Sequence, residues 1–214
     1  MGCKIFLVRH GETLWNHARR YQGHADIPLS ASGVAQARAL AGRLASQSFA
    51  GFYASDLQRA YATALILAAP HGLAVQKVPA LREIDFGDWE GLTREEIIEL
   101  YPDLSRRWWS QPRDTRLPGG ETLTEVATRA VGALREIAAR HPDDQVVVVT
   151  HGGTIRAGIA SLIHMDLNQY WRLRQDNTAL SIIEFFAPDR AQLLLFNDTC
   201  HLEGSDSHNI PING

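Results

Sequence analysis

The chain has 214 residues, 45% hydrophobic and 21% charged, which is long enough for one substantial core. Its 21 Lys and Arg and 24 Asp and Glu are spread along the sequence, which excludes the concentrated basic face of a nucleic-acid-binding protein. The apolar run near the N-terminus, Ile5 to Val8, is followed at once by charged residues, so we expect neither a signal peptide nor a membrane span, and cytoplasmic location is the default.

Apolar runs of strand length alternate with longer segments of helical period, the pattern of an α/β fold. We expect a three-layer α/β/α sandwich, with helices on both faces of a mostly parallel central sheet. The predicted strands cover residues 4–9, 51–54, about 74–78, 145–150, 180–186 and 192–196. The predicted helices are 34–45, introduced by residues 30–33; one capped by Ser55 or Asp56 and ending near 69; 121–140; and one beginning at 152.

The stretch from about residue 81 to 120 is less regular and rich in Trp, Pro and Arg. We expect residues 1–202 to form one domain, in which about 84–120 is a lid-like insertion over the sheet, followed by a disordered tail at 203–214.

Two features of this insertion have alternative interpretations. Four of its arginines could recognise an acidic substrate or form a solvated face, which is the favoured interpretation; these four are Arg106, Arg107, Arg113 and Arg116. Trp108 and Trp109 could stack on an aromatic base, but adjacent aromatics in a short helix more often fix that helix to the core.

No metal or other cofactor is predicted. Cys3 and Cys200 have no zinc-binding spacing, and without a secretion signal we expect both to be reduced. Histidines 10, 17 and 24 are seven residues apart, but their segment contains Gly and shows no sustained helical face that would bring them together. There is no phosphate-binding glycine–lysine loop and no Asp-rich pair for magnesium.

Two distant segments share an ending: the strand IFLV runs into Arg9-His10-Gly11, and VVVVT runs into His151-Gly152-Gly153. Each histidine therefore follows the carboxyl end of a buried strand. In an open parallel sheet these ends line one edge, and ligands bind outside it. If the two strands are neighbours, the two histidines face each other.

The groups expected near these histidines favour an anion. The helix that begins at Gly152 directs amide groups and a positive dipole end toward the same edge. Arg9 adjoins the first histidine, and Arg59 falls in the first turn of the helix after the second strand. Guanidinium groups match the paired oxygens of phosphate. Together these groups predict a site for a phosphoryl group.

The sequence resembles the histidine phosphatase superfamily, also called the phosphoglycerate mutase-like family. The resemblance covers residue 5 to about 200 and lies in LVRHGET (7–13), Trp15-Asn16, Tyr21-Gln22-Gly23, DIPLSASG (26–33), YASDLQRAYATA (53–64), LREIDFGDWEG (81–91), PGGET (118–122) and VVTHGG (148–153). It implies the phosphoglycerate mutase-like fold.

The resemblance also implies roles for particular residues. His10 attacks phosphorus and carries the phosphoryl group, while Arg9, Arg59 and His151 bind the transferring oxygens. Asn16, Gln22 and Gly23 are implied helpers on the phosphate and substrate side. Glu83 matches the general acid, whereas the residues alone favour a surface salt bridge with Arg82.

The segment after Glu83, IDFGDWEG (84–91), resembles the phosphatase branch and lacks the Arg-His-Tyr pattern of the cofactor-dependent mutases. The chain looks most like α-ribazole and broad-specificity phosphatases. Its ending at 198–202, DTCHL, also resembles some metal-independent phosphoserine phosphatases, although Phe86 stands where their substrate-binding histidine is expected.

We therefore expect a metal-independent phosphomonoesterase that takes a small phosphorylated metabolite as its partner. The alternatives are a phosphoglycerate mutase and a non-catalytic phosphate-binding module. The fold alone also permits a homodimer.

Overall fold

The computed structural model describes residues 2–187 and 189–203, so apart from Glu203 the predicted disordered tail lies outside the described residues. The strands are β1 (Cys3–Arg9), β2 (Gly51–Ala54), β3 (Val75–Lys77), β4 (Gln145–Thr150), β5 (Leu180–Ala187) and β6 (Arg190–Asp198). The helices are α1 (Leu14–His17), α2 (Ala31–Leu44), α3 (Gln58–Ala68), α4 (Arg94–Leu100), α5 (Pro102–Ser110), α6 (Leu123–Arg140) and α7 (Gly152–Leu162).

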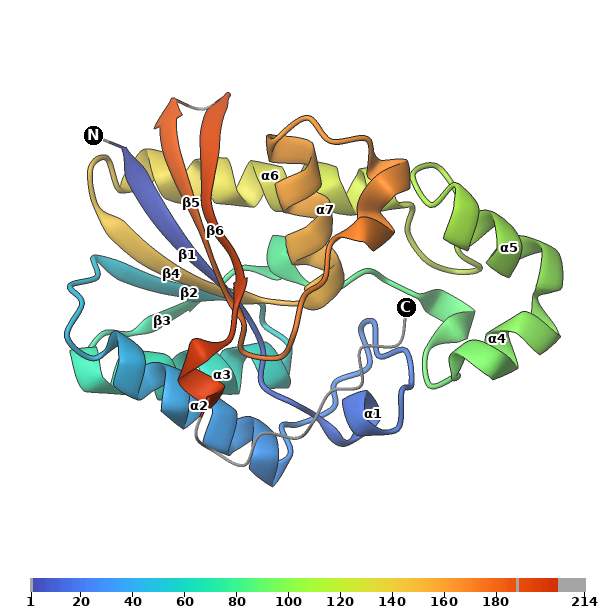
Figure 1. Cartoon of the computed structure of the whole chain (residues 1–214), viewed down its shortest axis with the longest axis horizontal. Coiled ribbons are helices and arrows are strands. Elements are labelled where there is room, and N and C mark those ends of the chain that lie inside the picture. The colour runs from blue at the N-terminus through green and yellow to red at the C-terminus, as the bar shows by residue number, and fades with distance from the viewer. Residues whose placement is uncertain (1, 188, 204–214) are drawn as a thin grey trace.

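The strands form one mixed sheet in the order β3-β2-β4-β1-β5-β6. The first four strands in this order are parallel, and the two closing strands, β5 and β6, are antiparallel. Helices α2 and α3 cover one face of the sheet, and α6 and α7 cover the other (Figure 1). The predicted α/β/α sandwich is confirmed.

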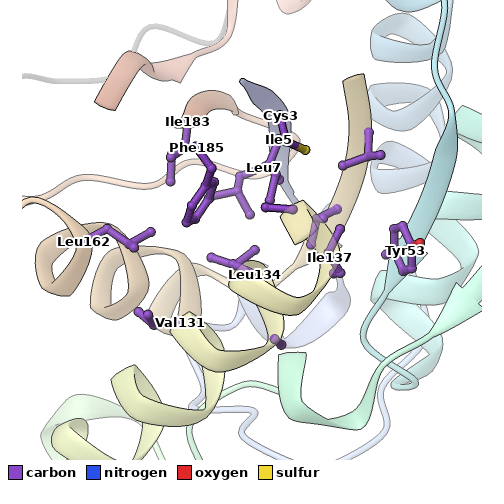
Figure 2. Packing of buried hydrophobic residues seen from close by; sticks show 14 of the residues in the cluster. Cys3, Ile5, Leu7, Tyr53, Val131, Leu134, Ile137, Leu162, Ile183 and Phe185 are labelled. Carbon is purple, nitrogen blue, oxygen red and sulfur yellow. The ribbon is translucent and has the colours of Figure 1, made fainter. Parts of the chain in front are cut away.

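The central strand β4 shows why the sequence specifies this sheet. Val146 to Val149 are all fully buried, and successive side chains belong to opposite faces. Burial on both faces requires the uninterrupted apolar run of this strand. Figure 2 shows the face covered by α6, where Ile5 and Leu7 of β1 lie near Leu134 and Ile137. Burial of each such side chain stabilises the fold by roughly 1.5–3 kcal/mol.

The predicted start of α3 is wrong. Its N-cap residue is Leu57, which makes no side-chain capping bond. The first helical amide, that of Gln58, instead donates to the Asp26 carboxylate at 2.7 Å. Asp56, a predicted cap, forms a salt bridge with Arg82 at 2.6 Å. Because Arg82 pairs with Asp56, the alternative interpretation of Glu83 as its salt-bridge partner is wrong.

Helices α4 and α5 lie in the predicted insertion and project to one side of the sheet (Figure 1). The insertion has its own apolar cluster, in which Trp89 and Trp108 are fully buried. This favours the structural interpretation of Trp108, while the role of the segment as a lid remains a prediction.

Both cysteines are free: Cys3 is buried in the core and Cys200 is exposed. Among residues 2–187 and 189–203, no three His, Cys, Asp or Glu side chains gather as a metal site would require. In the same part of the chain, no helix combines the length and hydropathy needed to span a bilayer.

Candidate active site

The carboxyl ends of β1 and β4 bring the two histidines together. The strands are parallel neighbours in which Arg9 is paired with Thr150, and the His10 amide continues the ladder by donating to the Thr150 carbonyl at 2.9 Å. The ring centroids of His10 and His151 are 5.2 Å apart, and both side chains are buried. The prediction that these neighbouring strands bring the two histidines together is confirmed, and the ring planes are tilted by 59°.

His10 has the protonation and tautomer of a nucleophile. Its Nδ1 lies 2.7 Å from the Gly11 carbonyl, which can only accept, so Nδ1 carries the hydrogen and Nε2 keeps a lone pair. Burial, with the nearby Arg59 and Arg9 charges, holds the pKa of His10 well below its usual 6.5. The imidazole is therefore neutral at physiological pH.

Gly11 permits the close approach of the chain after His10 to the start of α2. A Cβ at this position would lie 2.4 Å from the Gly33 carbonyl oxygen at the start of α2, a distance that no side chain tolerates. The Gly11 amide donates to the Thr63 hydroxyl at 3.0 Å, and that hydroxyl donates to the Arg59 carbonyl at 2.7 Å. The His10 loop is thereby tied to α3.

Two arginines lie at the same sheet edge, and neither has a carboxylate partner in the part of the chain that the structure describes. Arg59 is fully buried and donates to the carbonyls of Ala25 (2.8 Å) and Gly23 (2.7 Å), and its Nε has no partner among these residues. Arg9 donates to the Gln175 carbonyl at 2.6 Å, and its buried Nε is also unpaired. Burial lowers the pKa of Arg59 to about 10, so it remains charged.

His151 is the most isolated polar group in this set. It is fully buried, and neither ring nitrogen has a hydrogen-bond partner within the described residues. Burial, followed by the Arg59 charge, holds its pKa well below 6.5. A buried polar group without a partner costs about 1–3 kcal/mol. We call Arg9, His10, Arg59 and His151 the phosphoryl site, because an oxyanion there would satisfy these nitrogens.

Glu83 lies at the amino end of α7, beside the phosphoryl site. Its carboxylate accepts from the amides of Gly153 (3.1 Å) and Thr154 (3.0 Å). A carboxylate is stabilised at this positive end of a helix. Two amides expected to face an anion are therefore occupied by Glu83. The Gly152 amide remains, because the first residue of a helix has no intrahelical acceptor.

The three predicted helper residues lie close by. The Asn16 side chain caps α1 by accepting from the Thr13 amide at 3.0 Å, and Asn177 donates both to it (3.4 Å) and to the His10 carbonyl (3.0 Å). Gln22 is buried with its Oε1 unpaired. Gly23 adopts φ +53° while its carbonyl holds Arg59. Their roles toward a ligand remain predictions.

A known family model, that of the histidine phosphatase superfamily (branch 1), matches residues 5–199. The chain belongs to the histidine phosphatase superfamily. It is similar to phosphoserine phosphatase 1 of Hydrogenobacter thermophilus, 41% identical over 199 residues that cover 93% of this chain and 94% of the relative. It is 36% identical over 212 residues to phosphoglycerate mutase-like protein 4 of Arabidopsis thaliana, covering 94% of this chain and 87% of the relative.

Among solved structures, a candidate alpha-ribazole-5'-P phosphatase of Escherichia coli K-12 matches with a TM-score of 0.84 and 30% identity, covering 93% of this chain and 98% of that one. The predicted resemblance to the phosphatase branch is confirmed. The chain is an enzyme, a phosphatase, and the hypothesis of a non-catalytic module is set aside.

Sequence patterns did not indicate several residues that shape the site of this histidine phosphatase. Thr63 lies one helical turn after Arg59, so helical spacing could have indicated it. Gln175, which accepts from Arg9, and Asn177 belong to an irregular segment before β5 that carries no pattern. Phe86, at the expected histidine position, makes an apolar edge contact with Tyr21 at 4.9 Å between ring centroids.

Proposed function

We propose that the chain hydrolyses a small phosphomonoester through a phosphohistidine formed on His10. The observation that supports this most strongly is the neutral His10, with Nδ1 bound to the Gly11 carbonyl, beside a buried His151 that has no hydrogen-bond partner among the described residues. A lone pair on Nε2 beside unneutralised cations is what attack on a phosphoryl group requires.

In the first step, Nε2 of His10 attacks phosphorus in line as the bond from phosphorus to the ester oxygen breaks. Glu83, which is protonated when the negative phosphate of the substrate lies beside it, donates this proton to the departing alkoxide. Arg9, Arg59 and His151 bind the equatorial oxygens as their charge develops. In the second step, Glu83, now deprotonated, takes a proton from water, which attacks phosphorus. The bond from phosphorus to His10 breaks and releases phosphate, and His10 returns to its starting form.

Phosphoserine is the substrate we propose first, because the relative with 41% identity bears the name phosphoserine phosphatase 1. Alpha-ribazole phosphate is the second candidate, on the basis of the solved structure with a TM-score of 0.84. Phosphoglycerate mutase chemistry is the remaining alternative. It would replace the attacking water with a substrate hydroxyl.

The test uses purified protein treated with EDTA and a panel of p-nitrophenyl phosphate, phosphoserine, α-ribazole phosphate and 3-phosphoglycerate. We expect phosphate release that survives EDTA and is abolished by His10→Ala. His17→Ala, which changes an exposed histidine on α1, is the matched control and should retain activity. Interconversion of phosphoglycerates that requires a bisphosphate primer, without phosphate release, would instead establish the mutase.

The small-molecule partner, cytoplasmic location and homodimer remain proposals. Size-exclusion chromatography with light scattering measures the oligomeric state directly. Fractionation of cells that express the tagged chain measures its location.

A further inference from the structure

Arginine pairing distinguishes three side chains from the rest. Seven arginines in residues 2–187 and 189–203 are at least partly buried, and four of them bind a carboxylate at 2.6–3.0 Å. The pairs are Arg20–Glu96, Arg43–Asp198, Arg82–Asp56 and Arg129–Glu121. The three without a carboxylate are Arg9, Arg59 and Arg156. Arg9 and Arg59 belong to the phosphoryl site. The third, Arg156, is therefore a candidate to bind another part of the ligand.

Arg156 lies next to that site. It belongs to α7, and its Nε donates to the Gly152 carbonyl at 3.2 Å. Gly152 also approaches Arg9: a Cβ on this glycine would lie 3.2 Å from the Arg9 Nε. Both arginines thus lie close to the same glycine. The Arg156 charge is also one of the causes that lower the pKa of Arg9, after burial.

Two aromatic rings, those of Tyr170 and Trp171, form a wall that fixes the orientation of Arg156. Its guanidinium carbon lies 4.1 Å from the ring centroid of Tyr170 and 5.3 Å from that of Trp171. Trp171 donates to the Trp108 carbonyl of α5 at 3.3 Å, so the wall continues into the insertion. Stacking on aromatic faces restricts an arginine while leaving its edge available. Within the described residues, the two terminal amino groups of Arg156 have no acceptor.

We propose that Arg156 binds a carboxylate of the substrate, and that the enzyme acts on phosphorylated small carboxylic acids. The proposal rests on the proposed function at His10. The phosphoryl group already has Arg9, Arg59 and His151 to bind its oxygens, so a further cation on the flank fits a second anionic group. A guanidinium with a free edge matches a carboxylate through two parallel hydrogen bonds.

The test compares substrates that differ in this one group. Phosphoserine and phosphoethanolamine share a phosphate and an amine, and only phosphoserine has a carboxylate. For Arg156→Met we expect kcat/KM on phosphoserine to fall about 10- to 150-fold, mainly through KM, the range expected for charged hydrogen bonds. Activity on phosphoethanolamine and p-nitrophenyl phosphate should change by less than about threefold.

Two further variants complete the design. Arg156→Lys keeps the charge but loses the paired geometry, so it should have an intermediate KM for phosphoserine. Arg156→Lys also provides the test of the proposal if Arg156→Met does not fold. Arg135→Met, at an exposed arginine of α6, is the control and should leave every substrate unaffected.

Equal losses on all three substrates would overturn the proposal, because Arg156 would then support the phosphoryl site or the fold. Unchanged phosphoserine kinetics in Arg156→Met would overturn it too, as would a wild-type preference for phosphoethanolamine. If the wild type released phosphate from none of the three compounds, the proposed function itself would fail and this inference with it.

Discussion

The phosphoryl site and the insertion use arginine in opposite ways. At the phosphoryl site, Arg9 and Arg59 are partly or fully buried and bind only carbonyls. In the insertion, all five arginines are exposed, and three of them contact an acidic side chain: Arg106 with Asp103, Arg113 with Asp114 and Arg116 with Glu125. The favoured interpretation of the insertion arginines as a solvated face agrees with this pairing. The arginines that can bind an anionic ligand are therefore the buried ones, whose charge no carboxylate neutralises.

The largest expected effect separates these two sets of arginines. Arg59→Ala should lower kcat/KM for phosphate release by about 100- to 1000-fold, because a preorganised cation at the developing charge is lost. Arg106→Ala should stay within about twofold of wild type, since an exposed pair contributes little. Steady-state kinetics on p-nitrophenyl phosphate measure both. Comparable losses of kcat/KM in the two variants would contradict the difference proposed between these two sets of arginines.

The next effect concerns stability in the insertion. Trp108 is fully buried, with edge contacts to Trp89 (6.3 Å) and Trp171 (6.0 Å) between ring centroids. Trp108→Ala should lower the free energy of unfolding by about 3–5 kcal/mol, the cost of a large cavity. Urea denaturation measures this value. The half-buried Trp109 is the matched control, and its alanine variant should lose distinctly less. A Trp108 variant with unchanged stability but poorer substrate binding would favour stacking on a ligand.

The smallest effect is a pH dependence that arises at the phosphoryl site. The pKa values of folded His10 and His151 lie well below 6.5, so below pH 6.5 the unfolded chain binds more protons than the folded one. Stability is then highest above pH 6.5 and falls as the pH decreases toward the folded pKa values. Each histidine contributes at most about 1.4 kcal/mol per pH unit.

Unfolding free energies measured between pH 7 and 5.5 test this sign. His151→Gln should have a shallower slope than wild type, while His17→Gln should keep the wild-type slope. A slope that His151→Gln leaves unchanged would show that this imidazole is not held neutral by burial.

The sequence predicted the core and the two histidines because their signals are local. The valine run of β4 requires burial on both faces, and each His-Gly pair directly follows a strand. Helix α3 shows the opposite case: its first amide binds Asp26, a residue 32 positions earlier, which no local capping pattern can reveal.

Glu83 shows the same limit at the site. Its neighbour Arg82 offered an obvious local partner, but Arg82 pairs with Asp56, and Glu83 binds the amino end of α7, about 70 residues later. Only the resemblance to the family indicated its role as the acid. Arg156 escaped notice because its significance depends on the absence of a partner, which requires the folded structure.

The central claim is that Nε2 of His10 becomes phosphorylated, and rapid quenching tests it most directly. Protein mixed with phosphoserine would be quenched in alkali, where phosphohistidine survives, and mapped by peptide mass spectrometry. The account predicts a phosphoryl group on His10 that acid removes. With p-nitrophenyl phosphate, whose leaving group needs no general acid, Glu83→Gln should accumulate more of it because activation of water is slowed. A phosphoryl group on another residue, or turnover in His10→Ala, would contradict it.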